Sequence, residues 1–163
     1  MLNLYKYELH AHTSECDIYA RLSARELVHL YKNAGYDGMV ITDHYIEYFY
    51  NIWFSDELEG LTHEQQITRW LKGFRTAKEE GDKIGFVVLP GAEVRFNGYP
   101  NDYLIYGLQE DFFYTVPRLN ELRDIHGMER LAKGGIITTV KIETPEDLIA
   151  VLRNGNYSLI END

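Results

Sequence analysis

Strand-like and helix-like hydrophobic patterns alternate along the 163-residue chain, and this alternation most limits the folds open to it. Two apolar runs typical of buried strands, Tyr36 to Thr42 and Phe86 to Leu89, each follow a segment with the periodicity of an amphipathic helix. Further strands are expected at Tyr103 to Tyr106 and at Ile136 to Val140. This order predicts an α/β fold with a mainly parallel sheet.

Three helices are predicted from capping residues and glycine stops. Each begins at a Ser or Thr that is followed by a capping-box partner or a proline, and each ends near a glycine. A weaker helical pattern spans Pro117 to Leu131, and the aromatic, acidic segment from Tyr45 to Leu61 is predicted to be a loop. The three helices run from Ser23 towards Gly35, from Thr62 to near Gly81, and from Thr144 to Gly155.

Charge and composition restrict the class of partner. Sixteen Lys and Arg against twenty-six Asp and Glu give a formal net charge of −10, which leaves no basic stripe for a nucleic-acid backbone. A small substrate or a cation fits better. No window approaches the ~18 apolar residues of a membrane span, and the N-terminus lacks the pattern of a secretory signal. Because Cys16 is the single cysteine, a reducing, cytoplasmic location is expected.

Polar side chains alternate with apolar ones near the N-terminus. On a strand, Glu8, His10 and His12 point to one face, whereas Leu9 and Ala11 point to the other. Three stacked polar groups in a buried strand are costly unless they end in a site, and two imidazoles at this spacing can reach one cation. The alternative is an exposed edge strand that carries two ordinary histidines.

Two later predicted strands are also followed by ionisable residues. The run Met39 to Thr42 is followed by Asp43 and His44, and the run Phe86 to Leu89 leads to Glu93, with Arg95 on the same side. Active sites of parallel α/β folds lie at the carboxyl ends of their strands. The joint pattern therefore favours a metal centre over ordinary surface chemistry.

These segments resemble the motifs of the polymerase and histidinol phosphatase (PHP) domain family, whose members are metal-dependent phosphoesterases. Glu8 to Asp17 is similar to the first motif, although the family usually opens with Asp and has Ser where this chain has Cys16. Thr42 to His44 matches the second motif, and Pro90 to Glu93 matches the third. The following segment, Asn101 to Gly107, has Asp102 where many members have a ligating His.

The resemblance implies a ligand set. His10 and His12 would bind one metal, Glu93 would bridge two, and Asp17 and His44 would serve a further one, with Asp102 as a substitute ligand. One to three divalent ions, Zn, Mn or Fe, are implied, since mixed imidazole and carboxylate ligands suit them. The residues expected to take part in catalysis are His10, His12, His44, Glu93 and Arg95.

Supporting or structural roles are considered for several other polar residues. Glu8 and Asp43 are expected to orient imidazoles. Arg95 could hold a substrate phosphate or form a surface salt bridge, and both readings stay open. Cys16 is expected to be a packed thiol rather than a ligand. Solvated or capping roles are expected for the remaining histidines, His29, His63 and His126.

The resemblance breaks in the second half of the chain. The family's later His-Pro and Asp-x-His motifs are missing, whereas Gly134 to Leu148 resembles the usual close of these proteins. We therefore expect a single PHP-like domain over residues 1–163 with an internal deletion near 126–134. Its fold would be an incomplete, distorted (β/α) barrel of the PHP type, and exposed sheet edges would favour a homodimer.

Two functions are compatible with these features. The first is hydrolysis of a phosphate ester by metal-activated water, with a small phosphorylated substrate. The alternative is a degenerate PHP-like domain that binds metal or a partner without catalysis, because lost ligand motifs weaken a metal cluster. A purely structural α/β module is a third, plainer alternative.

Overall fold

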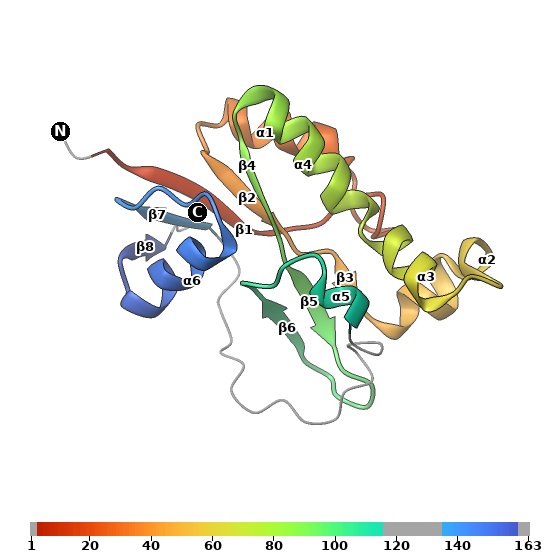
Figure 1. Cartoon of the computed structure of the whole chain (residues 1–163). Coiled ribbons are helices and arrows are strands. Elements are labelled where there is room, and N and C mark those ends of the chain that lie inside the picture. The colour runs from red at the N-terminus through yellow and green to blue at the C-terminus, as the bar shows by residue number, and fades with distance from the viewer. Residues whose placement is uncertain (1–2, 116–134, 160–163) are drawn as a thin grey trace.

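The structure is a computed structural model that describes residues 3–115 and 135–159. Strands of the described residues lie in two sheets (Figure 1). The strands are β1 (Tyr5–Ala11), β2 (Gly38–Ile41), β3 (His44–Tyr45), β4 (Val87–Pro90), β5 (Ala92–Arg95), β6 (Asp102–Ile105), β7 (Gly135–Thr138) and β8 (Tyr157–Leu159). The helices are α1 (Ala24–Asn33), η1 (Phe49–Trp53), α2 (Ser55–Leu58), α3 (His63–Trp70), α4 (Lys72–Ile84), α5 (Phe112–Thr115) and α6 (Pro145–Asn154).

The main sheet has five strands in the order β4-β2-β1-β7-β8, and the second has three in the order β3-β5-β6. The pairs β1/β2, β2/β4 and β3/β5 are parallel, so the strands around the predicted site follow the expected arrangement. The strands β6, β7 and β8 pair antiparallel with their neighbours. The described strands form an α/β fold and do not close into a barrel. Assignment to the PHP type stays a prediction.

Helices cover the main sheet on two sides. Met39 and Val88 pack into the core shared with α1 and α4, whereas Tyr7 and Val40 pack with residues of α6. Leu9 belongs to the α6 cluster and Ala11 to the α1 and α4 cluster, because the pairing register of β1 shifts between Glu8 and Ala11. The strict alternation predicted from residue 8 to residue 12 therefore fails at the end of β1.

The predicted helix starts are confirmed. Ser23, Thr62 and Thr144 each cap a helix through a complete capping box. The helix expected over 62–81 is instead two helices, α3 and α4, that meet at Leu71. Gly81 is not its stop. It lies within α4 where an added Cβ would meet the Phe86 carbonyl oxygen at 2.5 Å, so this glycine permits close approach to the next strand.

The prediction of a loop from Tyr45 to Leu61 is wrong. This segment contains the end of β3, the π-helix η1 and the short helix α2. Its aromatic residues Tyr45, Phe49 and Tyr50 are buried. A π-helix lacks the 3.6-residue repeat that reveals an amphipathic α-helix, so the apolar pattern here gave no periodic signal.

Two further expectations concern the second half of the chain. β6 and β7 lie at the predicted strands 103–106 and 136–140. The weaker helix 117–131 and the deletion near 126–134 fall outside the described residues. Within the described ranges, no helix is both long and apolar enough to cross a membrane.

Candidate metal centre

The chain passes from the main sheet to the second sheet twice, and these two connections bring candidate ligands together. The chain passes from β2 to β3 through Thr42 and Asp43, and from β4 to β5 through Gly91. His44 and Glu93 consequently face each other in register at the start of the second sheet. Gly91 makes this crossing tight, since an added Cβ would lie 2.7 Å from Cγ1 of Val40. The carboxyl end of β1 adds the two remaining imidazoles.

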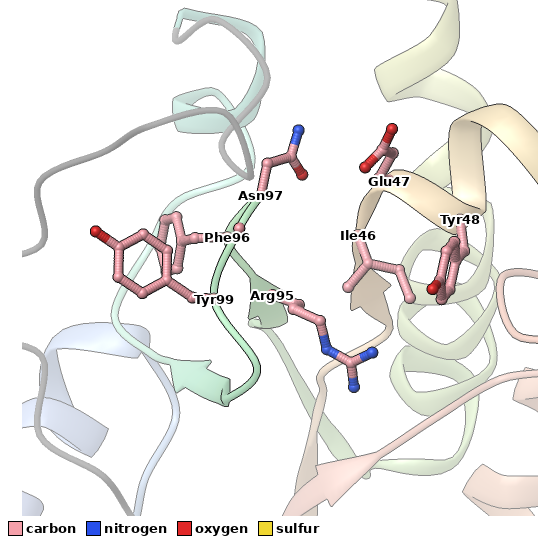
Figure 2. Close-up of a pocket in the computed structure, with 8 residues that line it drawn as sticks. Ile46, Glu47, Tyr48, Arg95, Phe96, Asn97 and Tyr99 are labelled. Carbon is pink, nitrogen blue, oxygen red and sulfur yellow. The ribbon is translucent and has the colours of Figure 1, made fainter.

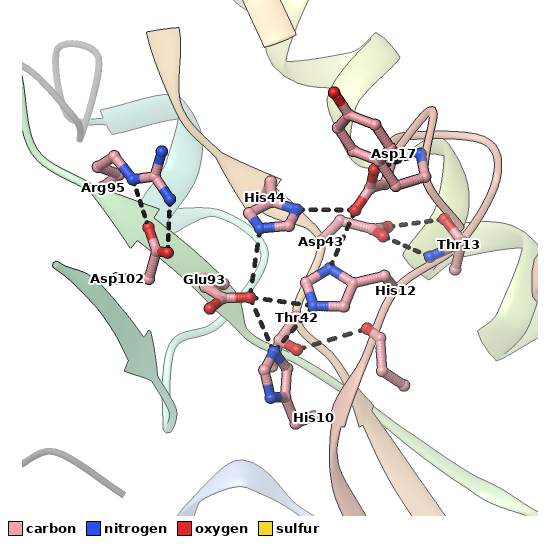
Figure 3. A network of polar contacts seen from close by, with 12 residues as sticks. His10, His12, Thr13, Asp17, Thr42, Asp43, His44, Glu93, Arg95 and Asp102 are labelled. Atoms are coloured by element: carbon pink, nitrogen blue, oxygen red, sulfur yellow. Dashed lines mark hydrogen bonds and ion pairs between the residues drawn. The ribbon is translucent and has the colours of Figure 1, made fainter. Parts of the chain in front are cut away.

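The first group of ligand atoms consists of His10, His12 and Glu93 (Figure 3). Nε2 of His10 lies 2.8 Å from Oε2 of Glu93, and Nε2 of His12 lies 3.0 Å from the same oxygen. The two imidazole nitrogens are themselves 2.8 Å apart. Three candidate ligands from β1, its following loop and β5 thus converge on one point.

The second group consists of His12, Asp17 and His44. Nδ1 of His44 lies 2.8 Å from Oδ2 of Asp17, whereas Nδ1 of His12 is 3.7 Å from that oxygen. The rings of His12 and His44 stack with centroids 4.5 Å apart. Because a neutral imidazole has one free lone pair, His12 can serve one of the two groups at a time.

The electrostatic environment favours the ionised form of the two candidate carboxylate ligands, Glu93 and Asp17. Burial opposes ionisation of Glu93, but hydrogen bonds from His10 and His12 outweigh it and hold the pKa of Glu93 well below its usual range. Burial likewise opposes ionisation of Asp17, and its bond with His44 lowers that pKa. Burial lowers the pKa of His12, whereas the bond with Asp17 overcomes burial and raises the pKa of His44.

The donor set fits a divalent cation. Two imidazole nitrogens at hydrogen-bond distance need either a proton or a cation between them, since two lone pairs repel. Nδ1 of His12 is buried and has no hydrogen-bond partner among the described residues. Orphaned buried polar atoms are rare, and this one faces the second group. Imidazole and carboxylate together suit Zn, Mn or Fe.

Glu8 and Asp43 support the centre differently from the expectation that they orient imidazoles. Oε1 of Glu8 accepts the backbone N–H groups of Leu9 and His10, each at 2.9 Å. The buried carboxyl of Asp43 accepts the backbone N–H and the hydroxyl of Thr13 at 2.6 and 2.8 Å. Burial raises the pKa of Asp43 to about 7. Both acids therefore hold the backbone beside the candidate ligands His10 and His12.

Asp102 lies outside both groups of ligand atoms. Its two carboxylate oxygens accept Nε and Nη2 of Arg95 at 2.7 and 2.6 Å (Figure 3). Arg95 therefore forms the salt bridge that was one of its two expected roles, while N–H groups not used by Asp102 stay on its guanidinium. A ligand role for Asp102 would require this bidentate pair to open, and it stays a prediction.

The remaining candidates behave as side chains of the core or the surface. Sγ of Cys16 donates to the carbonyl oxygen of Trp70 at 2.8 Å, and burial raises the pKa of this thiol well above its usual value. His29 pairs with Glu80 at 3.0 Å and is largely exposed. His63 begins α3, and His126 falls outside the described residues. Cys16 is thus a packed thiol, as expected.

Three residues near the centre were missed by sequence reasoning. Nε1 of Trp70 donates to the carbonyl oxygen of His44 at 2.9 Å. The ring of Trp53 packs edge-on against His44 with centroids 5.8 Å apart. A Cβ on Gly73 would lie 2.0 Å from Oγ1 of Thr13. None of the three belongs to a chemical motif. The capping box at Thr62 and the apolar periodicity after it predict the helix that carries Trp70 and Gly73, but they give no sign that these residues lie beside the centre.

Comparison with known proteins gives limited similarity. No family model matches the chain, and no curated protein matches it. A crystal structure of a protein from Bifidobacterium adolescentis ATCC 15703, provisionally described as a metal-dependent phosphoesterase, is 21% identical with a TM-score of 0.38. The match covers 60% of this chain and 25% of that protein, so the chain spans about a quarter of its length.

Proposed function

We propose that the chain is a metal-dependent phosphoesterase of the PHP type, which hydrolyses a phosphate ester of a small molecule. The observation that carries this proposal is the convergence of His10 and His12 on one oxygen of Glu93, within 3.0 Å. Three ligands of this kind would leave positions open for water and substrate, as catalytic metal sites do.

Each side chain has a role in the proposed reaction. His10, His12 and Glu93 would hold one divalent ion, and Asp17 with His44 would hold a further one. A bound divalent metal would polarise the phosphoryl oxygens and lower the pKa of water. Water would then add to phosphorus as the ester P–O bond breaks, and the alcohol would leave with the proton that the water gives up. His12 and His44 are each about one-fifth exposed, which leaves access from solvent at this side of the centre.

Arg95 is the proposed phosphate-binding residue. Asp102 holds two of its N–H groups, and its remaining donors can approach a phosphoryl oxygen near Glu93. A guanidinium kept in place by a carboxylate loses little side-chain freedom when it binds an anion. Arg95 would therefore neutralise charge that builds up on the phosphate in the transition state.

The proposal is tested by metal analysis together with turnover of a chromogenic phosphomonoester and a phosphodiester. Purified protein is expected to bind Zn, Mn or Fe and to hydrolyse at least one of the two esters. Mutation of residues that hydrogen-bond to metal ligands typically lowers metal affinity by roughly 10- to 100-fold. Glu93→Gln removes a candidate ligand itself and should therefore lower metal affinity by more than this. Glu80→Gln, which alters the remote pair with His29, is the matched control and should retain both properties.

The outcomes separate the alternatives. Metal binding without turnover, with affinity lost in Glu93→Gln, would identify a degenerate domain that keeps its metal. Absence of both binding and turnover would favour a structural module and would contradict the proposal. Turnover that persists unchanged in Glu93→Gln would place the chemistry elsewhere.

A further inference from the structure

A cavity lies along the free edge of the main sheet. Its volume is about 490 Å³, and none of its lining residues belongs to either group of candidate ligands. It is distinct from the smaller pocket of about 190 Å³ beside Arg95, which Figure 2 shows. The strand β4 ends the main sheet and pairs with β2 alone among the described strands. One side of β4 is therefore open to a partner.

The backbone of β4 has three hydrogen-bonding groups on this open side. The N–H groups of Val87 and Gly91 donate to carbonyl oxygens on the β2 side, at 3.0 and 2.9 Å. Because these groups alternate in direction along a strand, the N–H and C=O of Val88 and the C=O of Pro90 point away from β2. Pro90 itself has no N–H. An added strand would thus find one donor and two acceptors.

Helices cover the space beyond this edge on both faces of the sheet. The lining of the cavity comes from α4, from β4 and from segments 109–110 and 143–146, the last of which begins α6. Val88 packs in the core shared with α4, whereas Leu89 packs with residues of α6. A strand added to β4 would therefore be covered on both faces, as the strands of a parallel sheet are.

Acidic side chains surround the same edge. The cavity is lined by one lysine, Lys78, and by four acids: Asp82, Glu110, Glu143 and Glu146. Lys78 pairs with Asp82, and cations from outside the lining pair with Glu110 and Glu143. Glu146 accepts the neutral amide of Gln109 at 2.9 Å and has no ion-pair partner among the described residues. Exposed ion pairs are weak, so a basic partner can exchange with them and neutralise the remaining charge.

We infer that the open edge of β4 binds an extended, basic peptide segment of another protein. The segment would add to the main sheet as a strand, accept the N–H of Val88 and donate to the carbonyl oxygens of Val88 and Pro90. Its Lys or Arg side chains would meet the acids of the cavity. A second copy of the chain fits less well, because pairing two β4 edges would bring two sets of these acids together.

The first experiment measures peptide binding to the unaltered protein. The probe is a fluorescein-labelled octapeptide of alternating lysine and valine with blocked ends, and fluorescence anisotropy gives its Kd. A glutamate–valine peptide should bind about tenfold or more weakly, because its charges would be repelled. Absence of binding by the lysine–valine peptide would overturn the inference.

N-methylated peptides separate strand pairing from attraction between charges. One carries N-methyl groups on its valines and another on its lysines, so each loses the N–H donors along one edge and keeps every charge. One of the two should bind about tenfold or more weakly than the unmethylated peptide, because acceptors on β4 lose their donors. Equal binding of all three peptides would show that no strand is added.

Variants of equal charge locate the binding site. Glu143→Gln combined with Glu146→Gln removes two acids of the cavity and should raise the Kd by about two- to tenfold. Glu59→Gln combined with Glu64→Gln removes the same charge from exposed positions outside the cavity and should leave the Kd unchanged. Equal effects of the two double variants would indicate attraction to net charge alone, which contradicts the inference.

Amide hydrogen exchange reports on the strand itself. At a peptide concentration ten times the Kd, exchange at Val88 should slow by about tenfold, because exchange then proceeds from the small fraction of free protein. Val87, whose N–H already donates on the β2 side, should change less. Bound peptide without slower exchange at Val88 would rule out pairing with β4.

Sedimentation without peptide tests the other occupant of this edge. The protein is expected to be a monomer at the concentrations used for binding. A dimer in which Val88 is already protected would assign the edge to a second copy and overturn the inference. These measurements need neither bound metal nor turnover, so they stand apart from the test of the phosphoesterase proposal.

Discussion

At the scale of single residues, the candidate centre depends both on the candidate ligands and on side chains that fix the backbone next to those ligands. Asp43 accepts the backbone N–H and the hydroxyl of Thr13 in two short hydrogen bonds, and the candidate ligand His12 precedes Thr13 directly. Gly73 closes the same region from α4, because only hydrogen fits where a Cβ would approach Thr13 and Asp43. Small changes here should therefore reach the candidate metal ligands.

Gly73→Ala should disturb both stability and metal binding. The added methyl would lie 2.0 Å from Oγ1 of Thr13 and 2.5 Å from Oδ2 of Asp43, so α4 or the loop after β1 must move. Overpacking of this kind lowers the free energy of unfolding by about 1–3 kcal/mol. Urea unfolding and metal titration measure the two effects.

The neighbouring position provides the control for this change. Lys72 is exposed, so Lys72→Ala should alter the free energy of unfolding by no more than about 0.5 kcal/mol. Equal stability and equal metal affinity for Gly73→Ala and Lys72→Ala would contradict the close contact between α4 and the loop after β1.

At the scale of secondary-structure elements, capping boxes made the helix starts predictable, because a cap involves residues only three positions apart. The elements within 45–61 were not predictable in this way. The ring of Tyr45 packs against the distant Trp70 and Phe113, and Phe49 and Tyr50 are buried in the same core cluster. No local periodicity indicates a helix in this aromatic, acidic segment, which is why the sequence pattern predicts a loop there.

Tyr7 joins two distant elements and offers a test by pH. Its hydroxyl donates to the carbonyl oxygen of Ile142 at 3.0 Å and accepts its N–H at 2.8 Å, which connects β1 to the segment before α6. Tyr7→Phe should leave both backbone groups without a partner. The free energy of unfolding should fall by about 1–3 kcal/mol, as measured by urea unfolding at neutral pH.

The same residue should make stability depend on alkaline pH. Burial, partly offset by the bond with Ile142, raises the pKa of Tyr7 to about 12. An unfolded tyrosine ionises near pH ~10, so between about pH 10 and 12 ionisation favours the unfolded chain and stability falls. Tyr7→Phe should show a shallower decline over this range. Parallel declines for the two proteins would show that Tyr7 does not titrate in this way.

At the scale of the whole molecule, the candidate centre lies where the two sheets meet. His10 belongs to the main sheet, whereas His44 and Glu93 belong to the second sheet. A metal held between these residues would connect the sheets directly. Ligands that bind only the folded state stabilise it, by about 2.7 kcal/mol at a concentration one hundred times the Kd.

Metal addition should therefore stabilise both sheets together. Zn or Mn is expected to raise the unfolding midpoint and to slow amide hydrogen exchange in β1 and β2 as well as in β5 and β6, and a chelator should reverse both effects. His29→Ala should respond as the unaltered protein does, and His10→Ala should lose the response. Protection confined to one sheet would argue against a centre shared by both.

Sequence alone determined the parts of this protein that depend on near neighbours: the capped helices, the apolar strands and the kinds of side chain that end those strands. Tertiary structure decided which of those side chains meet. It brought His10, His12, Asp17, His44 and Glu93 together and paired Asp102 with Arg95 instead. Helix caps and strand patterns arise from hydrogen bonding and burial of residues near in sequence. The distances between candidate ligands depend instead on the connections between the two sheets, such as the one at Gly91 between β4 and β5.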